Sequence, residues 1–187
     1  MTLVSAGRGH ELNQIWRPDP ALRYSPRCAS TLEARAIHYP EVMHPVCTAC
    51  GFVLWQNRTL SVEALITRGE GDATEVLLGR RVSDGRWDLR GNFLNSGDFL
   101  EQALVRECRR EMGVDVRVAG ILGAFEDMFL GEPIVSLVYL CTVRAGEPRP
   151  GGLINDVEWF LVREPPPVAF DAVARSLAEL KQRLGIS

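Results

Sequence analysis

Residues 91–114 read GNFLNSGDFLEQALVRECRREMGV and decide the fold of the chain. They predict a glycine-containing loop followed by an amphipathic helix. Asp98 and Glu101 have the spacing of a capping box, and Gly113 stands where a helix commonly ends in a left-handed residue, so the helix should run from about Phe99 to Met112. Apolar residues four apart predict its buried stripe: Leu100, Leu104, Cys108 and Met112.

Glu107 and Glu111 are also four residues apart and share one edge of this helix. Like charges at this spacing repel, and they repel more strongly where water is scarce. A cation between the two carboxylates removes that cost. Because hard divalent ions prefer oxygen ligands, the pattern favours a magnesium-type site.

The same stretch resembles the signature of the Nudix hydrolases, G-x5-E-x7-R-E-U-x-E-E-x-G-U, in which U is apolar. Alignment on the R-E pair gives these matches: Arg106, Glu107, Cys108, Glu111, Gly113 and Val114. Just upstream, residues 87–91 (WDLRG) resemble the family's W-x-L-P-G-G, with Arg90 in the proline place.

Three residues depart from the signature. Asn92 replaces its opening glycine, and asparagine is one of the few residues that readily adopt positive φ. Asp98 replaces its first glutamate. Arg110 replaces the first glutamate of the E-E pair, so two of the three metal carboxylates remain and a fixed positive charge lies one turn from Glu107.

The resemblance implies a set of site residues. Glu107 and Glu111 are expected to bind Mg²⁺ or Mn²⁺, and Arg106 to orient a glutamate. Glu126 is a further catalytic candidate, as a base or a replacement ligand, with its neighbour Asp127 and with Glu158 as alternatives; for all three, a plain surface carboxylate is the other interpretation. The candidates for substrate contact are Arg81, Gly91, Asn92 and Arg110.

A second motif lies nearer the N-terminus. Cys47 and Cys50 with the following glycine have the spacing of a metal knuckle, and Cys28 belongs to a second knuckle that has Ser25 where its other cysteine is expected. The segment resembles the zinc ribbon of relatives of the NADH pyrophosphatases. Either His44 or His38 completes a site with three cysteines, or zinc has been lost and packing holds the loops. We take His44 as the candidate fourth ligand.

Composition and charge limit the classes of protein. The chain has 187 residues, 46% hydrophobic and 24% charged, which is typical of a soluble globular protein. A net charge of -3, with six arginines against four acids in residues 1–58, disfavours nucleic-acid binding. No apolar run approaches the roughly 18 residues of a membrane helix, and no signal-peptide pattern is present, so we expect a cytoplasmic protein. A homodimer is compatible with the sequence.

The remaining pattern predicts an α/β fold. β-type runs occur at 60–67, 75–80, 116–125, 134–143 and 157–160, the first two around a turn at 69–72 and the fourth apolar enough for a central strand. A last helix is expected from Asp171, as N-cap, to Leu184, with Val173, Leu177, Leu180 and Leu184 on one face. We therefore expect an extended lead-in (1–24), a zinc-ribbon-like subdomain (25–58) and a Nudix domain (59–187), the last an α/β/α sandwich with a mixed sheet.

The function that follows from the resemblance is a divalent-metal-dependent pyrophosphohydrolase. Its substrate would be a nucleoside diphosphate linked to another moiety, of the ADP-ribose or dinucleotide type. The S-Q-P-W-P-F-P stretch of NADH-cleaving relatives is absent, since residues 123–129 read GAFEDMF. One alternative is a weak or inactive Nudix domain that binds a nucleotide for regulation. Another is that the ribbon is the functional part, as a docking module for protein or nucleic acid.

Overall fold

The computed structural model describes residues 22–40, 42–55 and 57–186. The chain divides into two compact units, Met1–Asn57 and Arg58–Ser187, which are described separately. No helix in the described part is long and apolar enough to cross a membrane. Most of the expected lead-in, residues 1–21, lies outside the described residues.

The first unit contains a two-stranded antiparallel sheet. Strand β1 (Leu32–Ala36) pairs with β2 (Met43–Cys47), and Leu32 lies opposite Cys47 in the register. The hairpin between the strands therefore brings the loop that contains Cys28 next to the end of β2, where Cys47 and Cys50 lie.

The second unit is built from seven strands and two α-helices. In chain order these are β3 (Thr59–Arg68), β4 (Glu75–Arg81), β5 (Trp87–Asp88), β6 (Arg90–Phe93), α1 (Leu100–Met112), β7 (Asp115–Phe129), β8 (Glu132–Ala145), β9 (Ile154–Leu161) and α2 (Asp171–Leu184), with a short 3-10 turn at Gly71–Ala73.

The strands form one mixed sheet. Its main path is β5-β4-β3-β8-β7, with β6 paired to β3 and β9 paired to β4. The β3–β8 pair is parallel, whereas the other pairs are antiparallel. The expected β3–β4 hairpin and the central position of β8 are both confirmed.

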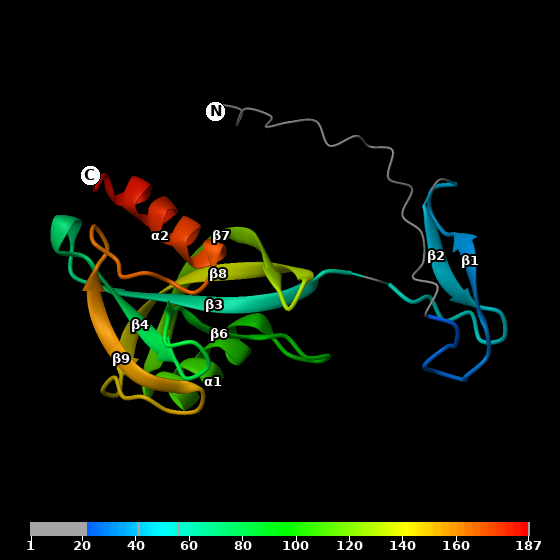
Figure 1. The fold of residues 1–187 in the computed structure, drawn as a ribbon, viewed down its shortest axis with the longest axis horizontal. Coiled ribbons are helices and arrows are strands. Elements are labelled where there is room, and N and C mark those ends of the chain that lie inside the picture. The colour runs from blue at the N-terminus through cyan, green and yellow to red at the C-terminus, as the bar shows by residue number, and fades with distance from the viewer. Residues whose placement is uncertain (1–21, 41, 56, 187) are drawn as a thin grey trace. The chain divides into compact units, whose positions relative to one another are not determined.

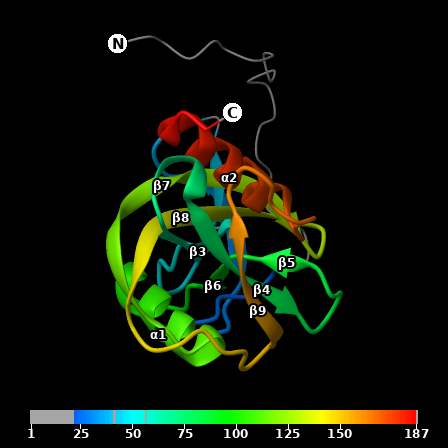
Figure 2. The same cartoon turned by 90° about the vertical axis from the view of Figure 1, so that its left-hand side faces the viewer.

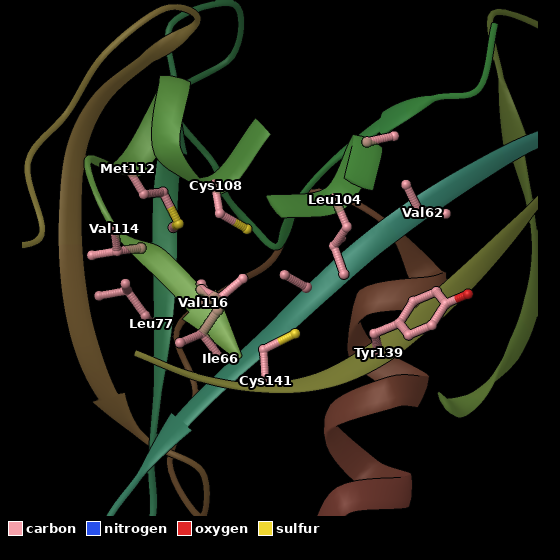
Figure 3. Close-up of a cluster of buried hydrophobic side chains, with 12 residues drawn as sticks. Val62, Ile66, Leu77, Leu104, Cys108, Met112, Val114, Val116, Tyr139 and Cys141 are labelled. Atoms are coloured by element: carbon pink, nitrogen blue, oxygen red, sulfur yellow. The ribbon is translucent and has the colours of Figure 1, made fainter. Parts of the chain in front are cut away.

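The two helices cover opposite faces of this sheet (Figures 1 and 2). Alternate residues of a strand point to opposite faces, and β3 shows this directly. Val62 and Ile66 belong to the core under α1, whereas Leu65 belongs to the core under α2. Figure 3 shows the first of these cores, in which Leu104 of α1 faces the sheet. The α/β/α sandwich with a mixed sheet is thus the fold of this unit.

The start of α2 differs from expectation. Phe170, not Asp171, is the N-cap residue, and no side-chain hydrogen bond caps the helix from that position. The backbone N–H of Ala172 instead donates to Oδ2 of Asp127 on β7 at 2.8 Å. An acid from the sheet therefore satisfies a helix N-terminus that the local sequence leaves open. Leu184, predicted on the buried face, is exposed because it occupies the last turn.

Candidate active site

The loop before α1 is organised by Asp98, although not as a helix cap. The helix begins at Leu100 with Phe99 as N-cap and no side-chain cap bond, so the predicted capping box is wrong. The carboxylate of Asp98 accepts hydrogen bonds from Asn95 N at 3.0 Å and Arg106 Nη1 at 3.3 Å. These two donors, the Asn95 N–H first, hold the pKa of Asp98 below its ordinary value. Asp98 thus ties the loop to the middle of the helix.

The buried stripe of α1 fixes which side of the helix faces the sheet. Leu104, Cys108 and Met112 are fully buried, as predicted (Figure 3). Leu100 is 37% exposed, and Ala103 takes its place in the core. The helix ends at Met112 with the following glycine at φ 70°, which is the expected left-handed cap.

Glu107 and Glu111 both lie in the interior, with only 1% and 3% of their surface exposed. Nη2 of Arg110 lies 2.5 Å from Oε2 of Glu107 and 3.0 Å from Oε1 of Glu111. The two carboxylates therefore converge on one point, and a guanidinium nitrogen occupies it. Arg106 Nε donates to the other oxygen of Glu107, Oε1, at 3.3 Å.

Arg90 is the site residue that the sequence reasoning missed. Its side chain is 9% exposed and donates to Glu111 Oε2 at 2.7 Å, to Asp88 Oδ2 at 2.8 Å and to the carbonyl of Leu89 at 2.6 Å. A buried arginine needs such partners because an unpaired buried charge is costly. The available signal was its place in the family's W-x-L-P-G-G approach, where a proline is expected.

A pocket of about 130 Å³ adjoins Arg90, on the side of the sheet that carries α2. Three of the four candidates for substrate contact line it, namely Arg81, Gly91 and Asn92, whereas Arg110 does not. The backbone of Asn92 lies in β6 without the positive φ that its place in the signature suggested. The rest of the wall is partly polar and partly aromatic: Ser61, Glu63, Asp88, Leu89, Phe93, Asp127, Phe129, Ile134, Ser136, Val138, Phe170, Ala172 and Val173.

Gly91 is required here by a close approach of two strands. It lies opposite Glu63 in the β3–β6 pair. A Cβ at position 91 would lie 1.6 Å from the carbonyl oxygen of Val62 and 2.5 Å from Oε2 of Glu63. No side chain fits in that space, so only glycine lets β6 pass against β3 at the pocket wall.

Two acids of the pocket, Glu63 and Asp88, have pKa values above those of the free side chains. Burial, with the neighbouring Asp88 charge as the next cause, raises the pKa of Glu63 from 4.5 to about 8. Burial also raises the pKa of Asp88, although Arg90 and Arg81 act against it. Arg81 contacts Asp88 at 3.3 Å and lies over the ring of Phe170, 4.5 Å from its centre. The pocket therefore combines a neutral acid, a cation and aromatic rings.

The other acid candidates lie elsewhere. Glu126 is exposed on β7 and pairs with Arg58, and Glu158 is exposed on β9. Among the described residues, no hydrogen bond or ion pair joins Glu126 to Glu107 or Glu111. The carboxylate of Glu126, expected just beyond a strand, lies within β7 and does not contact the acids of α1.

The donor set on α1 fits a magnesium-type ion that is held in part by a substrate. Mg²⁺ commonly takes one or two carboxylates together with phosphate oxygens and water. Glu107 Oε2 and Glu111 Oε1 face a common point, and Arg110, which is 56% exposed, is free to leave it. Glu111 Oε2 stays paired with the buried Arg90. In the described chain no third carboxylate joins these two at metal-binding distance.

The first unit brings three of the four zinc candidates together. The sulfurs of Cys28, Cys47 and Cys50 lie within 4.8 Å of one another. His44 is not part of this group, and its ring packs edge-on against Trp55 with 4.7 Å between ring centres. The ring of His38, the other histidine considered, stacks on the same Trp55 ring with 6.1 Å between ring centres, and His38 is not part of the cysteine group either.

Comparison with known proteins identifies the second unit. A model of the NUDIX domain family matches residues 57–181, the part of the chain that carries the sandwich and the helix with Glu107 and Glu111. The chain belongs to the NUDIX family. A NUDIX hydrolase of Nitrosomonas europaea has the same fold, with a TM-score of 0.68, 19% identity, and coverage of 87% of this chain and 93% of that one.

Two curated relatives of the NUDIX chain have named activities. It is 30% identical over 162 residues to the NAD-capped RNA hydrolase NudC of Pseudomonas aeruginosa, covering 84% of this chain and 55% of that protein. It is 28% identical over 123 residues to the ADP-ribose pyrophosphatase of Methanocaldococcus jannaschii, covering 63% and 70%. The chain spans about half the length of the NudC proteins that it matches.

Proposed function

We propose that this NUDIX domain is a pyrophosphohydrolase that cleaves a nucleoside diphosphate linked to another moiety, with a divalent cation as cofactor. The observation that carries the proposal is that Glu107 Oε2 and Glu111 Oε1, in the C-terminal half of α1, both face one point. Two buried carboxylates in that arrangement suit a cation that completes its coordination with phosphate oxygens. A structural ion pair alone does not require both acids to be buried.

The protein's own groups would set the geometry of the reaction. Mg²⁺ or Mn²⁺ would polarise phosphoryl oxygens and generate hydroxide near neutral pH. Arg106 holds one oxygen of Glu107, and Arg90 holds one oxygen of Glu111, so each carboxylate keeps a fixed orientation. Arg90 lines the pocket and also pairs with Glu111, so we place the diphosphate where the pocket approaches the two glutamates.

The pocket supports a nucleotide as the substrate class. Phe93, Phe129 and Phe170 lie within it, with 5.0 Å and 6.2 Å between successive ring centres, and they offer apolar faces to a planar group. Arg81, with its planar guanidinium, suits a phosphate. The names of the two curated relatives describe activity on NAD-capped RNA and on ADP-ribose. We assign this chain to the same broad class of nucleotide derivatives.

A second candidate is a NUDIX domain that binds a nucleotide without hydrolysing it. Arg110 and Arg90 together contact three of the four carboxylate oxygens of Glu107 and Glu111. Two cations against two carboxylates leave little net attraction for a divalent ion. In this alternative Arg110 turns outward to pair with a ligand phosphate, and no turnover follows.

A hydrolysis screen of the full chain separates the two candidates. The substrates are ADP-ribose, NADH, FAD, NAD-capped RNA and nucleoside triphosphates, each with and without Mg²⁺ and Mn²⁺. Glu111→Gln should lower turnover on the best substrate at least about a hundredfold. Glu101→Gln is the matched control because Glu101 is an exposed glutamate of the same helix. Binding of a nucleotide with no metal-dependent turnover of any substrate favours the binding domain instead.

A further inference from the structure

We infer that the hydroxyl of Ser25 is the fourth ligand of a zinc-type metal site formed with Cys28, Cys47 and Cys50. This inference concerns the first unit and does not depend on the proposed activity of the second. It replaces His44, the fourth ligand suggested by the sequence. The geometry supports it in three independent ways, through the backbone, through the distances and through the position of the histidine.

The backbone around Ser25 repeats the backbone around Cys47. Ser25 N donates to the carbonyl oxygen of Ser30 at 2.8 Å, and Cys47 N donates to that of Phe52, also at 2.8 Å. In each case the donor is the first ligand position of a knuckle and the acceptor lies five residues later. Ser25 therefore occupies the place in its loop that a ligand cysteine occupies in the other loop.

The turn of each loop is also the same. Ala29 N donates to the carbonyl oxygen of Ser25 at 2.8 Å, and Gly51 N donates to that of Cys47 at 3.2 Å. Ala29 has a φ of 58° and Gly51 a φ of 70°. Positive φ is uncommon for alanine. The first loop thus keeps the strained conformation of a metal knuckle although its first ligand is a serine.

Three distances among the four side-chain atoms are compatible with a tetrahedral site. The sulfur of Cys28 lies 3.4 Å from those of Cys47 and Cys50, and Ser25 Oγ lies 3.7 Å from the sulfur of Cys50. With Zn–S near 2.3 Å and Zn–O near 2.0 Å, the edges of a tetrahedron are about 3.8 Å for two sulfurs and about 3.5 Å for sulfur and oxygen. The sulfur–sulfur distances are about 0.4 Å shorter than the expected edge and the sulfur–oxygen distance is about 0.2 Å longer, so a metal ion needs only small side-chain shifts to bind here.

Ser25 is positioned to face the sulfurs, whereas His44 is not grouped with them. Ser25 is 3% exposed, and its Oγ accepts a hydrogen bond from Arg27 N at 3.2 Å. The corresponding sulfur, Sγ of Cys47, accepts one from the N–H of Cys50 at 3.4 Å. The His44 ring lies against Trp55 instead. Three thiolates and one hydroxyl bind zinc less tightly than four thiolates, and the oxygen position exchanges more readily.

Cobalt substitution of the full chain tests the ligand set without any reference to catalysis. The metal is removed by a chelator under reducing conditions and replaced by Co²⁺, and the absorption spectrum is recorded for wild type, Ser25→Cys, Ser25→Ala and His44→Ala. The sulfur-to-cobalt charge-transfer band scales with the number of thiolates. Ser25→Cys should therefore raise its intensity by about one third, from three thiolates to four, and should tighten Zn²⁺ binding at least about tenfold.

The other two variants identify the fourth ligand. Ser25→Ala should keep the charge-transfer band and change the ligand-field bands, because water replaces the hydroxyl. His44→Ala should leave both sets of bands unchanged. The inference is overturned if His44→Ala alters the ligand-field bands, if Ser25→Ala leaves them as in wild type, or if wild type binds no metal while Ser25→Cys does.

Discussion

Removing the positive charge of Arg110 should strengthen divalent-metal binding by the NUDIX domain. In the structure Nη2 of Arg110 lies where a cation bridging Glu107 and Glu111 would lie, at 2.5 Å and 3.0 Å from their oxygens. The metal and the guanidinium therefore compete for the same two carboxylates. Arg110→Gln keeps most of the side-chain length and removes the competitor.

The size of the effect follows from the two ion pairs. Arg110 is 56% exposed, so each pair is screened by solvent and contributes at most about 1 kcal/mol. A divalent ion has to displace one or both pairs, at a cost of about 1–2 kcal/mol. Because about 1.4 kcal/mol corresponds to a factor of ten in affinity, Arg110→Gln should lower the half-saturating Mg²⁺ concentration roughly 5- to 30-fold.

The assay is turnover of the best substrate as a function of Mg²⁺ concentration, with calorimetric titration of Mg²⁺ as a direct check. Arg109→Gln is the matched control because Arg109 is the adjacent, exposed arginine and pairs with Asp115 rather than with the two glutamates. If half-saturation in Arg110→Gln stays within twofold of wild type, the competition does not exist and the reasoning fails.

Arg110→Glu extends the same test to the choice between enzyme and binding domain. It adds a third carboxylate beside Glu107 and Glu111. If the domain is a hydrolase whose metal binding is weakened by Arg110, turnover should therefore rise above that of wild type. If Arg110 holds a ligand phosphate instead, the same change should weaken nucleotide binding and create little activity. The two functions thus predict opposite signs for one substitution.

Three further predictions concern stability. Arg90→Gln removes the buried cation shared by Asp88 and Glu111 and should lower the unfolding free energy of the domain by about 3–5 kcal/mol in denaturant titration. The exposed control Arg86→Gln should change it by less than about 1 kcal/mol. Glu63 has a folded-state pKa of about 8 against 4.5 for the free acid, so between these pH values the folded state binds a proton that the unfolded state has lost. The unfolding free energy should therefore fall as pH rises from about 4.5 to about 8, and Glu63→Gln should flatten this profile. Asp127→Ala removes the acceptor at the start of α2 and should cost about 1 kcal/mol, visible as faster amide exchange of the first helical turn.

The sequence predicts the elements of the fold well because their signals are local. β-type runs located β3, β4, β7, β8 and β9 to within a few residues, and the helical pattern located both helices, whereas the short strands β5 and β6 were not predicted. The errors occur where tertiary contacts override a local rule. Asp98 has the spacing of a cap, yet it binds Arg106 instead. Leu100 has the spacing of the buried stripe, yet it is exposed, whereas Ala103 in the same turn is fully buried.

The site was predictable only in the part that one helix contains. Spacing alone places Glu107 and Glu111 together, the family resemblance adds Arg106, and all three are in contact through ion pairs in the structure. Arg90 is 21 residues away from its partner Glu111, and its role appears only when β6 pairs with β3 beside α1. Its place in the W-x-L-P-G-G approach marks it as unusual, but that pattern does not show which acids it would pair with.

The two arginines have different consequences for the chemistry because one is buried and the other is exposed. Arg90 is buried and pairs with both Asp88 and Glu111, so moving it would break two buried ion pairs and leave its own charge uncompensated, and it is a fixed part of the site. Arg110 is held only by solvent-screened pairs and can exchange the two glutamates for another anion. A diphosphate that arrives with a divalent ion supplies both the cation for the glutamates and the anion for Arg110. Metal and substrate should therefore bind cooperatively, and the free domain should bind Mg²⁺ weakly.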